Sequence, residues 1–188
     1  MVLTEKSKSA ENLMLIMQRH DVKAYFLFLE HILYTFNSFN AFFQAAETRV
    51  YLLQPKSVKF LTTICEYFLK PELLKNVCNN IQFSQQENQK SLNEVNLGFE
   101  CEEYLDKLMK EGHTDIVAHV RKNCLQFCVT AAEEISKKLP INDKFLSKLK
   151  VLEANVALSD SDREISFNDV SFIAQTFGGF DEDGLKKE

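Results

Sequence analysis

The sequence has 188 residues, of which 45% are hydrophobic and 26% are charged, and these are ordinary values for a globular protein. Only five glycines and three prolines are present, which argues against a turn-rich all-β chain and favours helices. From Asp160 onward there are eight acids and three bases, so the first 159 residues are balanced at 19 of each. Because no basic stripe is present to neutralise phosphates, autonomous binding to duplex DNA is unsupported, although a local basic patch is not excluded.

The cysteines indicate a reducing environment. They are odd in number, irregularly spaced, and occur in a sequence without a secretory signal, so reduced thiols inside a cell are expected. The five are Cys65, Cys78, Cys101, Cys124 and Cys128. The apolar run Leu13–Met17 is too short for the core of a signal peptide, and no targeting segment is expected.

The chain is expected to begin with a disordered polar end, residues 1–8. Ser9 is a suitable N-cap for a first helix that runs from Ala10 to about Arg19. Asp21 is a suitable N-cap for the longer helix that follows.

That longer helix is KAYFLFLEHILYTFNSFNAFFQ, residues 23–44, which contains eight aromatic rings. Apolar residues recur at steps of three and four, which predicts one buried stripe. The stripe comprises Tyr25, Phe28, Leu29, Ile32, Phe36, Phe39 and Phe43. Four polar residues lie outside this stripe, namely Lys23, Glu30, Asn37 and Gln44. Because Phe26, Leu33 and Phe42 widen the apolar face, the helix is expected to be buried on more than one side.

So many rings raise three possibilities: a membrane span, a platform on which bases stack, or a protein core. A membrane span needs about twenty apolar residues with few charges, and Glu30, Asn37 and Asn40 interrupt this segment. Base stacking needs exposed rings beside Lys or Arg, and the segment contains only Lys23. Core packing is therefore the preferred interpretation.

Two prolines divide the next part of the chain, because Pro55 and Pro71 each suit the first turn of a helix. The helix between them is expected to bury Val58, Leu61, Cys65, Phe68 and Leu69. Residues 79–98 are rich in Asn, Gln and Ser with few apolar anchors, which predicts a flexible connecting loop.

Helical periodicity resumes after this loop. Helices are predicted over Phe99–Lys110, from Asp115 to a stop before Pro140, in a short segment capped near Asn142, and over Phe167–Phe177. The predicted buried face of the second comprises Ile116, Val120, Cys124, Phe127, Ala131 and Ile135. The fold class expected is all-α, an irregular bundle of about seven to eight helices. It would form a single domain at residues 9–178, followed by an acidic and polar C-terminal end at 179–188.

One group of residues has side chains that can bind a metal. Cys124 and Cys128 stand four apart on one helix face, and His113, His119 or Cys101 could complete a metal site. The spacing matches no usual zinc pattern, so buried structural thiols are preferred.

Two further histidines have no catalytic partner residue near them in the sequence. His31 lies beside Glu30 without a nucleophile, and His20 falls in a predicted turn between helices. We interpret the first as a histidine at a polar edge and the second as exposed.

The acidic clusters are interpreted as solvated surface. Glu102, Glu103 and Asp106 lie near Lys107 and Lys110, as on an exposed helix face. The segments DSDRE, residues 160–164, and DEDG, residues 181–184, lack the bidentate glutamate of a calcium loop. No phosphate-binding glycine loop, serine elbow or Cys-x-x-Cys pair occurs. The sequence therefore predicts no catalytic residue, no metal or cofactor site, no small-molecule substrate and no membrane span, and no residue can be assigned to DNA binding.

Three segments carry a family resemblance. They are DVKAYFLFLEHILYTFNSFNAFFQAAETRVYLL, then FLKPELL, then CLQFCVTAAEEISKKLPINDKFLSKLKVL. In this order of aromatic and apolar residues, the sequence resembles hAT-type transposases and the cellular proteins derived from them, over roughly Ser9 to Gly179. The resemblance falls on the helical insertion that interrupts the RNase H-like nuclease domain of that family.

The resemblance implies a fragment without catalytic activity. The three metal-binding acids of the nuclease would lie before Met1 and beyond Glu188, so none is transferred to this chain. Family members often hold a displaced base with a tryptophan of the insertion, and this sequence contains no tryptophan. It also lacks the spacing of a BED-type zinc finger.

The leading hypothesis is a helical module that supports a nuclease fold, makes protein contacts or self-associates, and binds DNA only weakly or within a longer protein. The resemblance also implies a nuclear location. The alternative is a freestanding helical module for protein interaction, unrelated to transposition.

Overall fold

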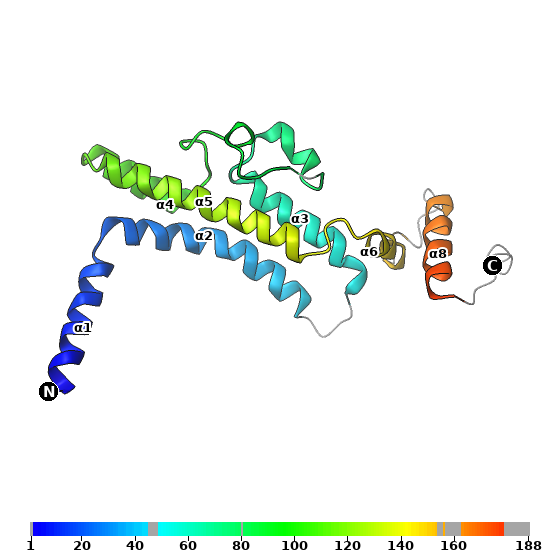
Figure 1. Cartoon of the computed structure of the whole chain (residues 1–188), viewed down its shortest axis with the longest axis horizontal. Helices are drawn as coiled ribbons and strands as arrows, with labels where there is room; N and C mark the ends of the chain where they lie inside the picture. Colours follow the sequence, from blue (N-terminus) through cyan, green and yellow to red (C-terminus); the bar gives the residue numbers. More distant parts are fainter. Residues whose placement is uncertain (1, 45–48, 80, 154–155, 157–162, 179–188) are drawn as a thin grey trace.

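The computed structural model describes residues 2–44, 49–79, 81–153, 156 and 163–178 (Figure 1). Within these ranges there is no β-strand, only an isolated bridge between Leu69 and Gln89. The helices are α1 (Val2–Met17), α2 (His20–Phe43), η1 (Val50–Leu52), α3 (Leu53–Glu66), η2 (Pro71–Asn76), η3 (Gln86–Asn88), α4 (Phe99–Lys110), α5 (Thr114–Lys138), α6 (Lys144–Lys148), η4 (Leu149–Leu152) and α8 (Arg163–Phe177). The predicted all-α, multi-helix fold class is confirmed.

The centre of the bundle is formed by α2, α3, α4 and α5. Helix α2 packs against the other three, and α5 packs against α3 and α4 as well. Helix α1 projects from the start of α2, whereas α6 and α8 lie at the opposite end of the bundle (Figure 1). This arrangement places the second half of α2 beside α3, where the two helices share aromatic residues.

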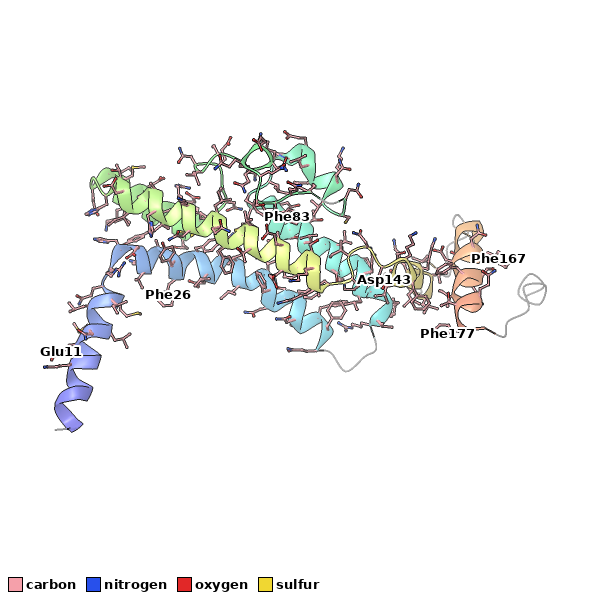
Figure 2. The ribbon with its side chains drawn as sticks, viewed as in Figure 1. Glu11, Phe26, Phe83, Asp143, Phe167 and Phe177 are labelled. Carbon is pink, nitrogen blue, oxygen red and sulfur yellow. The ribbon has the colours of Figure 1, made fainter. Side chains whose placement is uncertain are left out.

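The predicted stripe of α2 forms part of the core. Phe28 and Ile32 are buried, and Tyr25, Leu29, Phe36 and Phe39 pack against the buried cluster. The prediction that α2 is buried on more than one side is wrong. Phe26 is 54% exposed and Leu33 is 41% exposed, and Phe26 lies on the outer side of the helix (Figure 2). The reason is that the helices packed on α2 leave this side without a neighbour among the described residues.

The start of the chain differs from the prediction. Helix α1 begins at Val2, so residues 2–8 are helical and Ser9 is not an N-cap. Leucine, glutamate and lysine in this segment are strong helix formers, and that propensity extends the helix. Helix α2 begins at His20 with Arg19 as its N-cap, and Asp21 lies inside the first turn, where it pairs with the Arg19 guanidinium at 2.6 Å.

Residues 79–98 are held to the bundle more firmly than the sequence suggests. The apolar residues of this segment are few, but Phe83, Val95 and Leu97 are buried and anchor it to the core. The backbone is fixed as well, because the Lys90 amide donates to the Phe68 carbonyl at 2.8 Å. The loop lacks an α-helix because its polar residues form turns and η3, yet those turns carry its few apolar side chains into the core cluster.

The remaining helices follow the predictions closely. Helix α4 has the predicted bounds, and α5 spans Thr114–Lys138. The cap of α6 is Asp143 instead of Asn142, and its carboxylate accepts from the Leu146 amide at 2.8 Å. Helix α8 begins four residues earlier than expected. Most of the acidic segment 160–164 and all of 179–188 lie outside the described residues, and the single-domain division stays a prediction.

Candidate functional site

The predicted thiol group is buried in the core. Cys65, Cys101, Cys124 and Cys128 are each at most 1% exposed. Burial raises the pKa of Cys101 to about 11 and that of Cys128 to about 12, which keeps both thiols protonated at neutral pH. Among the described residues, no group of His, Cys, Asp or Glu is placed to hold a metal ion. The prediction of buried thiols is confirmed.

The two histidines considered as partners of these thiols lie elsewhere. His113 and His119 are near the start of α5, where the His113 ring lies 5.0 Å from the His20 ring. His20 is exposed as predicted, but its Nδ1 atom also lies 2.7 Å from the Tyr104 hydroxyl. His20, His113 and Tyr104 thus form a polar cluster at the end of the bundle where α2 begins, with His20 exposed and the other two half-buried.

His31 is exposed, as its predicted position at a polar edge requires, and its ring contacts Tyr67 edge to face at 5.4 Å. Gly98, with φ of +87°, passes directly over this ring. A β-carbon at Gly98 would lie 2.7 Å from the His31 Cβ, which is too close for van der Waals contact. Glycine is therefore required here both by the backbone and by the space.

The carboxylate cluster on α4 is only partly a solvated face. Glu102 pairs with Arg121 of α5, with the closest nitrogen and oxygen at 2.5 Å, and the Arg121 side chain is 9% exposed. The Glu102 carboxylate also accepts from the Leu97 amide, and Arg121 donates to the Leu92 carbonyl. The interpretation of Glu102 as solvated surface is wrong, because the tertiary structure brings a buried arginine to it. The pair ties the end of the loop to α4 and α5.

A groove between the second half of α2 and the first half of α3 is the best candidate for a binding site. It has a volume of about 180 Å³. Its lining consists of Thr35, Ser38, Phe39, Phe42, Lys56, Lys59 and Phe60. We call this surface the α2–α3 groove.

Four aromatic rings build the groove and its support. The Phe39 ring is stacked on Phe60, with centroids 4.5 Å apart and planes at 14°. Phe36 meets the same Phe60 ring edge to face at 5.1 Å, which supports the stack from inside the bundle. Phe42 forms a further wall one helical turn beyond Phe39. The floor is thus apolar and fixed by packing between two helices.

The rim of the groove is cationic. Lys56 is half-buried, and its Nζ atom lies 4.4 Å from the centroid of the Phe42 ring. Lys59 is exposed one turn further along α3, on the same face. In the ranges that the structure describes, neither ammonium group has a carboxylate partner. The Arg49 guanidinium lies 4.6 Å from the centroid of the same Phe42 ring.

The groove is not apparent from the sequence, because the aromatic segment forms only one of its two sides. Within residues 23–44 the only base is Lys23, but the fold brings Lys56 and Lys59 of α3 beside Phe39 and Phe42. The available signal was the spacing Lys56-x-x-Lys59 on a helix whose opposite face is apolar. This spacing indicates a cationic face without saying which rings it would meet.

Comparison with known proteins identifies no relative. No family model, no curated protein and no solved structure matches this chain. The fold and the α2–α3 groove are therefore the observations from which function has to be inferred.

In the described part of the chain, none of the helices combines the length and the apolar character needed to cross a bilayer.

Proposed function

We propose that this chain is a non-catalytic helical module for protein contacts, related to the helical insertion of hAT-type transposases, and that the α2–α3 groove is its contact surface. The observation that carries the proposal is the groove itself, an apolar floor of packed rings with lysines at its rim. A surface of this kind suits an exposed protein segment better than a reaction, because neither a carboxylate nor an imidazole lines it to activate the Ser38 and Thr35 hydroxyl groups.

The relation to hAT-type transposases is supported by the way the three resembling segments pack. The first forms α2, the second continues from the end of α3 into η2, and the third forms α5 to η4. These elements supply much of the buried cluster, including Phe28, Phe68 and Cys128. A shared pattern of core residues is what common ancestry would preserve. The proposal includes a nuclear location and only weak DNA binding by this chain alone.

Sequencing the transcript on both sides of this reading frame tests the ancestry. The proposal expects segments that encode RNase H-like strands with three acidic residues, and a BED-type finger. Flanking frames without either would refute the ancestry and leave the contact role standing. Incubation of the purified chain with DNA and Mg²⁺ or Mn²⁺ tests the absence of catalysis, since metal-dependent cleavage would contradict it.

A second candidate is a freestanding interaction module unrelated to transposition. The exposed apolar run at the end of α1 favours it, because Leu13, Met14, Leu15, Ile16 and Met17 are each 47% to 64% exposed. Contiguous exposed apolar residues mark contact surfaces in soluble proteins. This candidate predicts that replacing Leu13 and Ile16 by serine abolishes partner capture while groove variants retain it.

A further inference from the structure

The size of the α2–α3 groove limits what it can accept. Its volume of about 180 Å³ is close to the roughly 150 Å³ of a cavity that holds one benzene molecule. Sites for drug-sized ligands and cofactors usually measure about 300 to 1,000 Å³. The groove therefore suits a single bulky apolar group, such as one aromatic or aliphatic side chain of a partner.

The polar groups around the groove indicate which charge a ligand should carry. The Ser38 hydroxyl donates to the Tyr34 carbonyl at 2.8 Å, and the Thr35 hydroxyl lies 3.4 Å from the Tyr67 hydroxyl. Both hydroxyl groups thus have partners within the bundle. The ammonium groups of Lys56 and Lys59 can therefore pair with a ligand. They favour a ligand that carries negative charge next to its apolar group. The nearest acids along the chain are Glu47 and Glu66, of which Glu47 lies outside the described residues.

Single-stranded nucleic acid also combines flat groups with negative charge, but the rings of the groove are poorly placed for it. Base stacking needs open ring faces. One face of Phe39 is covered by Phe60, and the Phe42 ring already contacts the Lys56 ammonium and the Arg49 guanidinium. The groove is also too short to follow several nucleotides, and the charge of residues 1–159 is balanced. The observations favour a peptide.

We propose that the α2–α3 groove binds an acidic peptide segment of a partner protein, in which carboxylates adjoin one bulky apolar side chain. The apolar side chain lies on the Phe39 and Phe60 floor, and the carboxylates pair with Lys56 and Lys59. This inference rests on the proposed contact role and specifies the chemistry of the partner. Such motifs occur in disordered segments, which gain affinity from a few anchors while the rest stays solvated.

The full chain itself supplies a suitable probe, because residues 179–184 read Gly-Phe-Asp-Glu-Asp-Gly. A fluorescein-labelled peptide of this sequence would be titrated with the full chain and followed by fluorescence anisotropy. Two further peptides test the chemistry, one with amides in place of the three carboxylates and one with alanine in place of phenylalanine. A thymidine oligomer of about ten nucleotides tests nucleic acid at the same surface.

Three chain variants are compared with the wild type. K56E/K59E reverses the rim charge, and Ser38→Trp fills the groove without a charge change. K107E/K110E is the matched control, because these lysines of α4 have the same spacing and line a different surface. Thermal melts followed by circular dichroism establish that each variant is folded. The titration is repeated with D181N/E182Q/D183N, in which the chain's own acidic segment is neutralised.

The proposal expects binding of the acidic phenylalanine peptide and a loss of at least about tenfold in affinity for K56E/K59E. Ser38→Trp should weaken binding similarly, K107E/K110E should stay within about twofold of wild type, and both altered peptides should bind weakly. Tighter binding by D181N/E182Q/D183N would support the same chemistry, with the chain's own segment as a competitor.

The possible negative results overturn different parts of the proposal. Absence of peptide binding to both the wild type and D181N/E182Q/D183N would overturn the inference, as would equal binding by K56E/K59E. Groove-dependent binding of the thymidine oligomer in place of the peptide would overturn both the inference and the proposed protein-contact role. A partner captured through the groove, without binding of the acidic peptide, would overturn the inference alone. A partner captured through another surface, with an empty groove, would also overturn the groove as the contact surface.

Discussion

Replacement of Arg121 by alanine tests how the loop is attached to the bundle. The change removes the guanidinium that pairs with Glu102 and donates to the Leu92 carbonyl. Breaking a buried ion pair costs about 3 to 5 kcal/mol, because the remaining charge loses its partner. The Glu102 side chain is 32% exposed and can recruit water, which lowers the expected cost to about 2 to 3 kcal/mol.

The assay is urea denaturation followed by circular dichroism, with Lys107→Ala as the matched control. Lys107 forms an exposed ion pair with Glu111 at 3.9 Å, and loss of such a pair is worth about 0 to 0.5 kcal/mol. Amide hydrogen exchange should also show faster exchange at residues 91–97 in the Arg121 variant. Equal stabilities for the two variants, with unchanged exchange in the loop, would refute the role given to Arg121.

Three further predictions concern the core. Phe36→Ala should destabilise the chain by about 3 kcal/mol, since the ring packs on Phe60 in the core; a thermal melt like wild type would contradict this. Gly98→Ala should cost more than Gly112→Ala in urea denaturation, because both have positive φ but only Gly98 would place a β-carbon against His31. Burial raises the pKa of Cys128 from 9.0 to about 12, so the unfolded state loses this proton first and the unfolding free energy should fall above about pH 9, by up to about 1.4 kcal/mol per pH unit. Cys128→Ala should reduce that slope, and an unchanged slope would contradict the assignment.

Local periodicity was sufficient to predict most of the fold. The stripe of α2 from Phe28 to Phe39 and the bounds of α4 follow from apolar spacing and from the glycines that flank α4. The burial of Cys124 and Cys128 follows from their shared helix face. These features depend on residues that are close together along the chain.

The features that local periodicity missed depend on contacts between distant residues. Arg121 meets Glu102 across 19 residues, and nothing in the local sequence of either distinguishes it from a surface charge. Phe26 and Leu33 look like core residues by composition, but no described helix covers them. The groove likewise needs α2 and α3 to be placed side by side before Lys56 meets Phe42.

The central claim is that this chain acts through protein contact at the α2–α3 groove. The most direct measurement is affinity capture from nuclease-treated nuclear extract, comparing the wild type with K56E/K59E and with the control K107E/K110E by quantitative mass spectrometry. The account predicts a stoichiometric partner that the wild type and the control retain and that K56E/K59E loses. Equal capture by all three chains, or retention only when DNA is present, would contradict it.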